Sequence, residues 1–174
     1  MGICGGFQML GIQVEDPDGL EGEVGITDGL GLLEMTTRMI EGKQLKNVTG
    51  ELSASLPLPE NAVNTARLSG YEMHNGVTTG AALDRPLARL DGRPDGAISD
   101  DDQVIGSYVH GIFDEPSACE ALLAWAGLRG EQKAIDYQQH RLQQLDRLAD
   151  QVEQHLDTDW LKTLLDVKQT GTAR

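Results

Sequence analysis

The stretch Met1-Gly2-Ile3-Cys4-Gly5-Gly6-Phe7-Gln8-Met9-Leu10-Gly11 opens the chain and carries its clearest structural signal. It places a cysteine between glycines in the order Gly-x-Cys-x-Gly, ahead of a short apolar helical pattern over residues 7–12. This order is the cysteine form of the nucleophile elbow, a strained turn from a strand into a helix. Such a turn lifts the sulfur of Cys4 clear of the sheet, and the helix N-terminus favours its thiolate. The stretch therefore predicts a reactive Cys4 rather than a buried structural thiol.

A formal net charge of −14 over 174 residues limits the partners of this chain. An acidic surface repels phosphate backbones and anionic lipid headgroups, so we expect no binding to nucleic acid or to a membrane. No apolar run reaches the roughly 18 residues of a membrane span, and no secretory signal opens the sequence. The two cysteines, Cys4 and Cys119, make no disulfide framework, so we expect a cytoplasmic protein with free thiols.

The remaining pattern predicts an α/β fold, with a mostly parallel central sheet and Cys4 at a strand-to-helix turn. We expect one domain over residues 1–167 and a disordered tail over residues 168–174. Residues 15–25, rich in Gly, Pro and acids, are typical of a loop. The expected strands are 35–40 and 46–54 around a turn at 41–43, 68–74 ending in a turn at Asn75-Gly76, 87–90, 96–99 and 104–109. The expected helices are residues 115–128, 131–156 and 160–167.

The last of these strands delivers His110 at its end, beside Gly111. Paired with an elbow cysteine, a histidine serves as the acid and base of acyl transfer. The thiolate attacks a carbonyl, backbone N–H groups hold the oxyanion, and the imidazole protonates the leaving group. The residue after an elbow nucleophile normally donates one oxyanion N–H, which nominates Gly5. When the substrate is a primary carboxamide, the leaving group is ammonia.

The elbow, together with the late stretch Tyr108-Val109-His110-Gly111, resembles the class I, triad-type glutamine amidotransferases. Within that superfamily, five motifs in order are similar to the C-terminal glutaminase part of cobyric acid synthases. They are residues 4–11, Asp16-Pro17-Asp18-Gly19-Leu20-Glu21-Gly22, Gly29-Leu30-Gly31-Leu32-Leu33, Gly70-Tyr71-Glu72-Met73-His74 and Ser107-Tyr108-Val109-His110-Gly111-Ile112-Phe113-Asp114. The resemblance spans residues 1–114 by motif and implies the flavodoxin-like sheet of class I glutamine amidotransferases.

The resemblance implies a role in cobalamin biosynthesis. Cobyric acid synthases use glutamine and ATP to amidate carboxylates of adenosylcobyrinic acid a,c-diamide, a corrin, and their glutaminase part supplies the ammonia. ATP and Mg²⁺ belong to an N-terminal activating domain, so we expect no cofactor and no metal in this segment. Carried onto this sequence, Cys4 is the nucleophile, His110 the general acid and base, and Gln8 a residue near the bound L-glutamine. The residues expected at the pocket wall or on the corrin side are Tyr71, Glu72 and His74.

Two departures from the family pattern leave questions open. Many class I amidotransferases carry Glu two residues after the histidine, where this chain has Ile112, so the orienting acid is open between Asp114 and Glu72. Residues 1–3 are shorter than a typical strand of about 5–6 residues, and no Gly-Lys-Ser/Thr phosphate loop is present. We therefore expect a fragment of an enzyme, unable to make cobyric acid alone. Two alternatives remain: the glutaminase part of a related cobyrinic acid a,c-diamide synthase-like ligase, or a truncated, non-catalytic remnant.

Overall fold

The computed structural model describes residues 1–54, 56, 66–128, 136–156, 160 and 163, and divides the chain into two units, Met1–Ile135 and Asp136–Arg174. The second unit contributes the helix α3 (Tyr137–His155), which Asp136 caps by accepting a hydrogen bond from Gln139 N at 2.9 Å. The helix expected over residues 131–156 is therefore confirmed from Tyr137 onward. Most of the helix expected over 160–167, and all of the tail expected over 168–174, lie outside the described residues.

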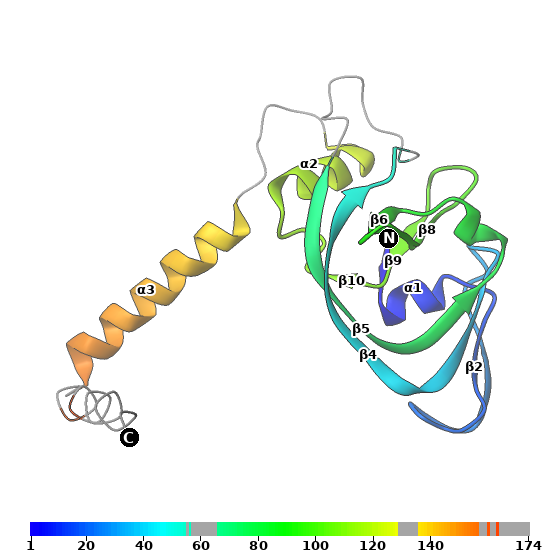
Figure 1. The fold of residues 1–174 in the computed structure, drawn as a ribbon, viewed down its shortest axis with the longest axis horizontal. Helices are drawn as coiled ribbons and strands as arrows, with labels where there is room; N and C mark the ends of the chain where they lie inside the picture. Colours follow the sequence, from blue (N-terminus) through cyan, green and yellow to red (C-terminus); the bar gives the residue numbers. More distant parts are fainter. Residues whose placement is uncertain (55, 57–65, 129–135, 157–159, 161–162, 164–174) are drawn as a thin grey trace. The chain divides into compact units, whose positions relative to one another are not determined.

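Two long strands frame the first unit, because β4 (Thr36–Leu52) and β5 (Arg67–Thr79) pair antiparallel along most of their length. Figure 1 shows both strands bending around the short helix α1 (Gly5–Met9). The turns expected at residues 41–43 and at Asn75-Gly76 are therefore wrong. Pairing with β4 holds Gly76 opposite Met39 and His74 opposite Gln44, and the register shift between these pairs absorbs residues 40–43 as a bulge.

The short strands form a second sheet and connect it to the first. β1 (Gly2–Ile3) pairs with β9 (Ile105–Ser107), which pairs in turn with β8 (Ala97–Ile98). β10 (Val109–His110) belongs instead to the large sheet, where it pairs with β5. The single strand expected over residues 104–109 is thus divided at Tyr108, where the chain passes from one sheet to the other.

The direction of strand pairing also differs from expectation. Among the strands that the structure describes, only β1–β9 and β2–β4 pair in parallel. The expectation of a mostly parallel sheet is wrong, because the largest pairing, between β4 and β5, is antiparallel. The α/β class itself is confirmed, since helices and a large sheet occur together in the first unit.

The smaller elements correct several expected boundaries. The ends of the loop expected over residues 15–25 are strands, β2 (Gln13–Asp16) and β3 (Gly25–Asp28), which pair with each other. Asp16 closes the turn between them, because its carboxylate accepts hydrogen bonds from Leu20 N at 2.8 Å and Glu21 N at 2.9 Å. The strand expected over 87–90 forms a hairpin with residues 93–95 rather than with 96–99. The remaining elements are η1 (Ala81–Asp84), β6 (Ala88–Leu90), β7 (Arg93–Asp95) and α2 (Pro116–Trp125).

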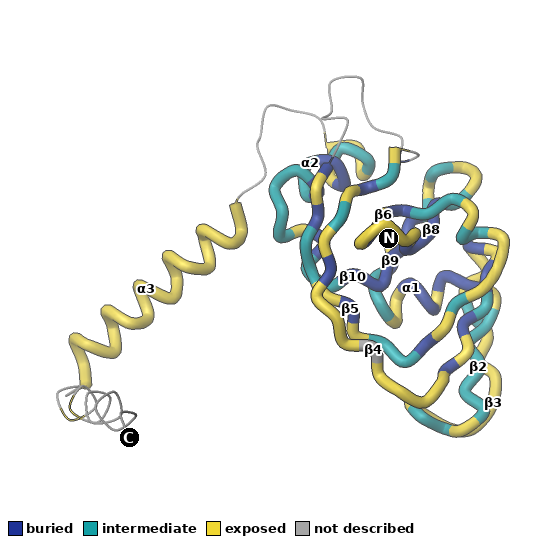
Figure 2. Tube along the Cα trace, viewed as in Figure 1, coloured by how far each residue is buried: buried dark blue, intermediate teal, exposed yellow. Residues whose placement is uncertain are grey.

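Two buried clusters hold the first unit together (Figure 2). The larger cluster packs α2 against both sheets through fully buried side chains that include Leu87, Leu90, Ile105, Val109 and Ile112. The smaller cluster anchors α1, because Phe7 is 1% exposed and its ring meets the ring of Tyr108 edge-on at 5.3 Å. By contrast, α3 has no buried residue.

Candidate active site

Cys4 lies at a strained turn between β1 and α1. Its backbone adopts φ 52° and ψ −114°, a positive φ that a non-glycine residue rarely takes. Gly2 is required beside it, since a Cβ there would lie 2.5 Å from the carbonyl oxygen of Gly6. Cys4 N donates to the carbonyl of Ser107 at 2.9 Å and so ties the turn to the end of β9. The structure therefore has the strand-turn-helix geometry that the sequence predicts for an elbow.

His110 lies at the end of β10, against β5. Its ring stacks on the ring of Tyr71 at 4.9 Å with an interplanar angle of 9°. Gly70 permits this approach, because a Cβ at that position would collide with the carbonyl oxygen of His110. His110 Nε2 is buried and has no hydrogen-bond partner. The thiol of half-buried Cys4 donates to Met73 O at 3.5 Å. In this structure, therefore, no hydrogen bond joins the predicted nucleophile Cys4 to the predicted acid and base His110.

Neither acid proposed to orient the histidine contacts it within the described part of the chain. Asp114 N donates to Gly111 O at 2.8 Å and closes the turn after His110, while no ion pair of its carboxylate is found there. Glu72 is 5% exposed and forms an ion pair with Arg93, and it lies 4.0 Å from Nε2 of His74. The orienting acid therefore stays unassigned between these two residues.

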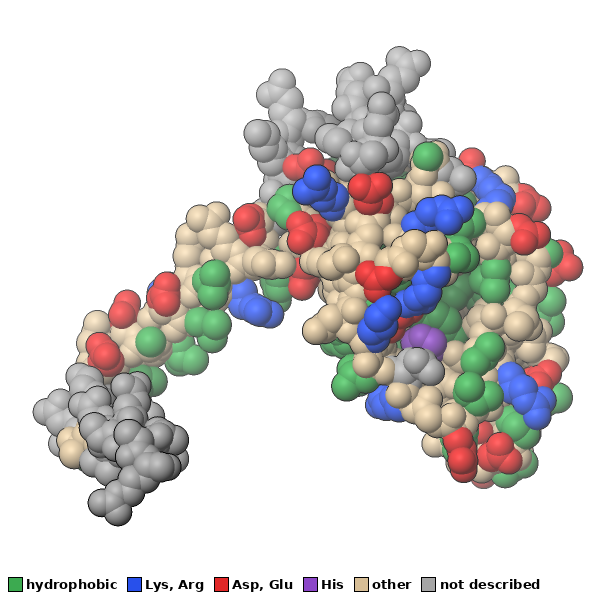
Figure 3. Space-filling model, in the orientation of Figure 1, with side chains coloured by type: hydrophobic (Ala, Val, Ile, Leu, Met, Phe, Trp, Pro, Cys, Tyr) green, Lys and Arg blue, Asp and Glu red, His purple; other side chains and the backbone are tan. Residues whose placement is uncertain are grey.

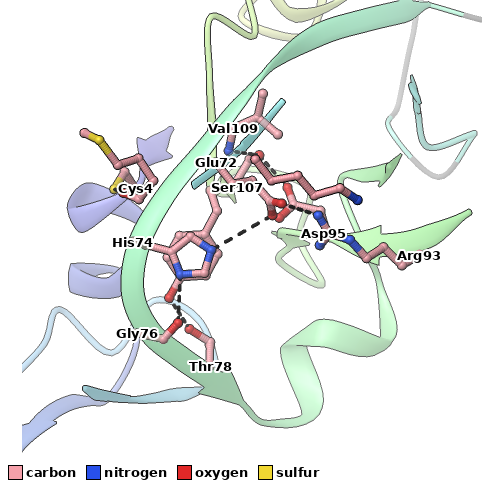
Figure 4. Close-up of polar contacts among 12 residues, drawn as sticks. Cys4, Glu72, His74, Gly76, Thr78, Arg93, Asp95, Ser107 and Val109 are labelled. Carbon is pink, nitrogen blue, oxygen red and sulfur yellow. Dashed lines mark hydrogen bonds and ion pairs between the residues drawn. The ribbon is translucent and has the colours of Figure 1, made fainter. Parts of the chain in front are cut away.

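A cavity of about 440 Å³ lies beside β5, and Glu72, His74, Arg93, Asp95 and Tyr108 are among the residues that line it. Figure 3 shows a hollow in which a histidine is bordered by basic, acidic and hydrophobic side chains. The other five predicted site residues are not among its lining: Cys4, Gly5, Gln8, Tyr71 and His110. Figure 4 shows Cys4 on one side of the β5 ribbon and Arg93 and Asp95 on the other.

The predicted substrate-binding residues are therefore divided. Glu72 and His74 line the cavity, whereas Tyr71, on the alternate side of β5, lies against His110. Gln8 is 8% exposed, and its amide donates to the hydroxyl of Tyr108 at 3.4 Å. Gly5 is exposed beside Cys4, and a Cβ built there would meet no atom within 4 Å, so space for a ligand is open at the expected oxyanion donor.

Three polar residues that the sequence did not single out complete this region: Arg93, Asp95 and Ser107. Asp95 is 7% exposed and accepts a hydrogen bond from Ser107 Oγ at 2.5 Å. Burial raises the pKa of Asp95, and the hydrogen bond from Ser107 opposes that rise. The hydrogen bond to Glu72 raises the pKa of Arg93. Ser107 lies inside one of the five motifs, whereas Asp95 lies in the turn between the expected strands 87–90 and 96–99 and has no sequence signal of its own.

Neither a metal site nor a membrane-spanning helix is found among the described residues. No three His, Cys, Asp or Glu side chains in this part of the chain come together in a way that could hold a metal ion. None of its helices has the length and apolar character that crossing a membrane requires.

Comparison with protein families matches residues 1–118 to the CobB/CobQ-like glutamine amidotransferase domain. The matched segment is more than half of the 174 residues and contains Cys4, Gln8, residues 70–74 and His110. The match confirms the class I glutamine amidotransferase-like fold and supports a glutaminase role with glutamine as substrate. This chain is a member of the family of CobB/CobQ-like glutamine amidotransferase domains.

Proposed function

We propose that Cys4 and His110 hydrolyse the side-chain amide of L-glutamine and release ammonia. The backbone of Cys4 carries this proposal. A non-glycine residue at φ 52° between a strand and a helix is strained, and such strain is maintained at sites that must present a nucleophile. Among the described side chains, His110 Nε2 is one of two buried polar atoms without a partner, the other being Asn75 Oδ1. An unpartnered imidazole nitrogen is free to exchange a proton with substrate.

The reaction follows from these positions. The Cys4 thiolate attacks the carboxamide carbon of glutamine, and the backbone N–H of Gly5 donates to the oxyanion. His110 protonates the nitrogen as the carbon–nitrogen bond breaks, and ammonia leaves. Water, deprotonated by His110, then attacks the thioester and releases glutamate and the thiol. Gln8 lies near the opposite end of α1 from the elbow turn, where its amide donates to the Tyr108 hydroxyl, and in our proposal it lies near the bound glutamine.

The ammonia acceptor is the finer part of the proposal. We infer that the acceptor is adenosylcobyrinic acid a,c-diamide, amidated in cobalamin biosynthesis by a cytoplasmic cobyric acid synthase of which this chain is the glutaminase part. Support comes from the five motifs in order and from the family match. ATP and Mg²⁺ act in carboxylate activation, for which we assign no residue here. A cobyrinic acid a,c-diamide synthase-like ligase is the alternative acceptor system, because the family description covers both types.

Reaction with an electrophilic glutamine analogue tests the site, and the chain contains its own control thiol. Cys119 is half-buried. Its burial raises the pKa of its thiol, and the negative charge of Glu120 raises that pKa further. We expect mass spectrometry to find the analogue on Cys4 and not on Cys119, and we expect Cys4→Ser to abolish the reaction. Equal labelling of both thiols, or labelling that free L-glutamine does not slow, would show that no glutamine pocket forms and would favour the non-catalytic remnant.

The acceptor needs a separate experiment. The chain is combined with an ATP-dependent activating domain, and ammonia transfer is followed with each of two corrin acids. Amidation of the a,c-diamide supports the cobyric acid synthase assignment, whereas amidation of cobyrinic acid at positions a and c supports the alternative. Amidation of the a,c-diamide by this chain alone, with ATP and glutamine, would contradict the expectation that it needs an activating partner.

A further inference from the structure

Ser107 lies at the point where the chain passes between the two sheets. It ends β9 in the small sheet, and β10 begins two residues later in the large sheet. Its side chain is fully buried, at 0% exposure. Cys4 is hydrogen-bonded to Ser107, and His110 follows Ser107 by three residues at the end of β10. Ser107 therefore connects the two proposed catalytic residues.

Three hydrogen bonds of Ser107 connect these parts. Its carbonyl accepts from Cys4 N at 2.9 Å, and its Oγ accepts from Val109 N, next to His110, at 3.0 Å. The hydroxyl proton is donated to Asp95 Oδ2 at 2.5 Å, as the dashed lines of Figure 4 show. A serine hydroxyl rotates freely unless an acceptor holds its proton. Asp95 therefore fixes the orientation in which Oγ can accept from the backbone beside His110.

The backbone N–H of Tyr108 also favours the charged form of Asp95 and so lowers its pKa. A carboxylate offers two acceptor oxygens, whereas the amide of asparagine offers one oxygen and one NH₂ group. Of the charged groups around Asp95, Arg93 is on the same strand and Glu72 faces it from β5. Arg93 is itself tied to Glu72. Burying a carboxylate without a dedicated counter-ion costs stability, so its presence here calls for a role other than packing.

We propose that Asp95 is a positioning residue that acts through Ser107 to hold Cys4 and His110 in register for the reaction. The inference rests on the proposed function, because only a reaction needs both residues aligned. Asp95 touches neither glutamine nor the reacting atoms in this proposal. Its whole effect passes through the Ser107 hydroxyl, and that restriction makes the idea testable by a double-mutant cycle.

The cycle uses Asp95→Ala, Ser107→Ala and the double variant in the 174-residue chain, with the rate of Cys4 labelling by the glutamine analogue as readout. We expect each single variant to slow labelling by about 10- to 100-fold, the scale on which small misplacements act. The double variant should label no more slowly than Ser107→Ala alone. Asp95→Asn should fall between wild type and Asp95→Ala, because the amide oxygen of asparagine can still accept from the Ser107 hydroxyl but carries no charge. Asp91→Asn is the matched control, since Asp91 is an exposed-loop acid paired with Lys46, and it should label like wild type.

A merely structural role predicts a different pattern. There, loss of labelling would follow loss of thermal stability, and a destabilised core variant, Leu122→Ala, would slow labelling as much. Positioning predicts that Leu122→Ala labels normally below its melting temperature. It also predicts that Asp95→Ala lowers the maximal labelling rate and leaves the half-saturating analogue concentration unchanged. The inference would be overturned if the fold reduction in the double variant equalled the product of the two single reductions. It would also be overturned if Asp95→Ala were labelled as fast as wild type.

Amide hydrogen exchange separates failure of this inference from failure of the proposed function. Cys4 N and Val109 N both donate to Ser107, so Asp95→Ala should speed exchange at these two amides by about 10-fold or more. Absence of glutamine-specific labelling in wild type would reject the proposed function alone. Unchanged exchange at Cys4 and Val109 in Asp95→Ala would reject the positioning role, whatever the labelling shows.

Discussion

Two groups of residues lie along β5 and differ in whether their polar atoms have partners. One is the cavity cluster (Glu72, His74, Arg93, Asp95 and Tyr108), and the other is the Cys4–His110 pair. In the cavity cluster, Arg93 pairs with Glu72, His74 Nδ1 contacts Gly76 O at 2.9 Å, and the Tyr108 hydroxyl contacts Thr78 Oγ1 at 2.6 Å. In the Cys4–His110 pair, the thiol makes one long contact to a carbonyl and the buried imidazole Nε2 makes none.

This difference separates polar groups that hold the fold from polar groups kept available for chemistry. A buried polar atom without a partner costs about 1–3 kcal/mol, so folded proteins rarely leave one. The cavity cluster follows that rule, and His110 departs from it, while Cys4, its proposed partner, lies in a strained turn. We infer that variants of the pair should damage the reaction more than the fold. Variants of the cluster should damage the fold more than the reaction, with the exception of Asp95, whose proposed positioning role links the cluster to the pair.

The largest effect is expected from His110→Gln. Glutamine retains polarity but cannot carry a proton between substrate and water, so glutaminase turnover should fall by about 10²- to 10⁴-fold. Stability should hold or rise, because the variant removes an unpartnered ring nitrogen. Rates of ammonia release and urea unfolding curves measure the two quantities. His140→Gln on α3 is the control for a histidine exposed on a helix and should change neither. A His110→Gln chain that unfolds before it loses turnover would erase the distinction between pair and cluster.

Gly70→Ala should affect both fold and reaction, because Gly70 lies where β5 meets the pair. The added Cβ would collide with the carbonyl oxygen of His110 and lie 2.8 Å from Cγ1 of Val109. Moving β10 away should cost about 1–3 kcal/mol of stability and lower the turnover rate. The control is Gly22→Ala, since a Cβ there meets no atom within 4 Å. Thermal unfolding of the two variants compares them directly, and equal melting temperatures would mean that β10 is not packed against Gly70 as described.

The elbow was predictable from sequence because its requirements are local. Glycines around a cysteine, followed by a helical pattern, specify a strand-turn-helix turn within a few residues, and the structure has that turn at Cys4. His110 was predictable as a strand-end residue for the same reason. The α/β class followed from the coexistence of strand and helix patterns.

The rest depended on partners distant in sequence. The Asn75-Gly76 pair favours a turn in isolation, but pairing with β4 keeps it within a strand. Asp95 accepts a hydrogen bond from Ser107, which lies twelve positions later in the sequence. Glu72 pairs with Arg93, which lies twenty-one positions later. The hydrophobic periodicity of the sequence does not predict such contacts between distant residues. The pairing directions were missed for the same reason, since they depend on how connections fold back rather than on the strands themselves.

Asp95→Asn tests the cost of the buried acid through pH. Burial raises the pKa of Asp95 above its ordinary value of 3.8, so the unfolded chain releases this proton first as pH rises. Between the two pKa values the native state holds more protons, and the free energy of unfolding falls with rising pH. Asparagine does not titrate, so wild type should lose stability relative to Asp95→Asn as the pH rises above 3.8.

Urea unfolding at several pH values measures this drift, and Asp101 supplies a control of opposite sign. The hydrogen bond from Ser99 lowers the pKa of Asp101, so its contribution is present above pH 3.8 and is lost as pH falls. With rising pH, the free energy of unfolding of wild type should therefore increase relative to that of Asp101→Asn and decrease relative to that of Asp95→Asn. Parallel drifts in both variants would show that Asp95 is not held in a desolvated site.

Tyr108→Phe should have the smallest effect and belongs to the cavity cluster. Phenylalanine keeps the ring stacked on His74 at 3.8 Å and edge-on to Phe7, but it loses the hydroxyl contacts with Thr78 and Gln8. We expect a loss of about 1 kcal/mol in the free energy of unfolding, the usual net value of a hydrogen bond. Tyr137→Phe, at an exposed tyrosine of α3, is the matched control and should change nothing.

Turnover of the same Tyr108→Phe variant sharpens the comparison further. If Gln8 touches substrate, freeing its amide from Tyr108 should raise the KM for glutamine and leave kcat close to wild type, since neither Cys4 nor His110 contacts this hydroxyl. A fall in kcat larger than the change in KM would place the Tyr108 hydroxyl in the reaction. The boundary between the cavity cluster and the Cys4–His110 pair would then have to be redrawn to include Tyr108, because a residue that supports the fold would also be needed at the reacting atoms.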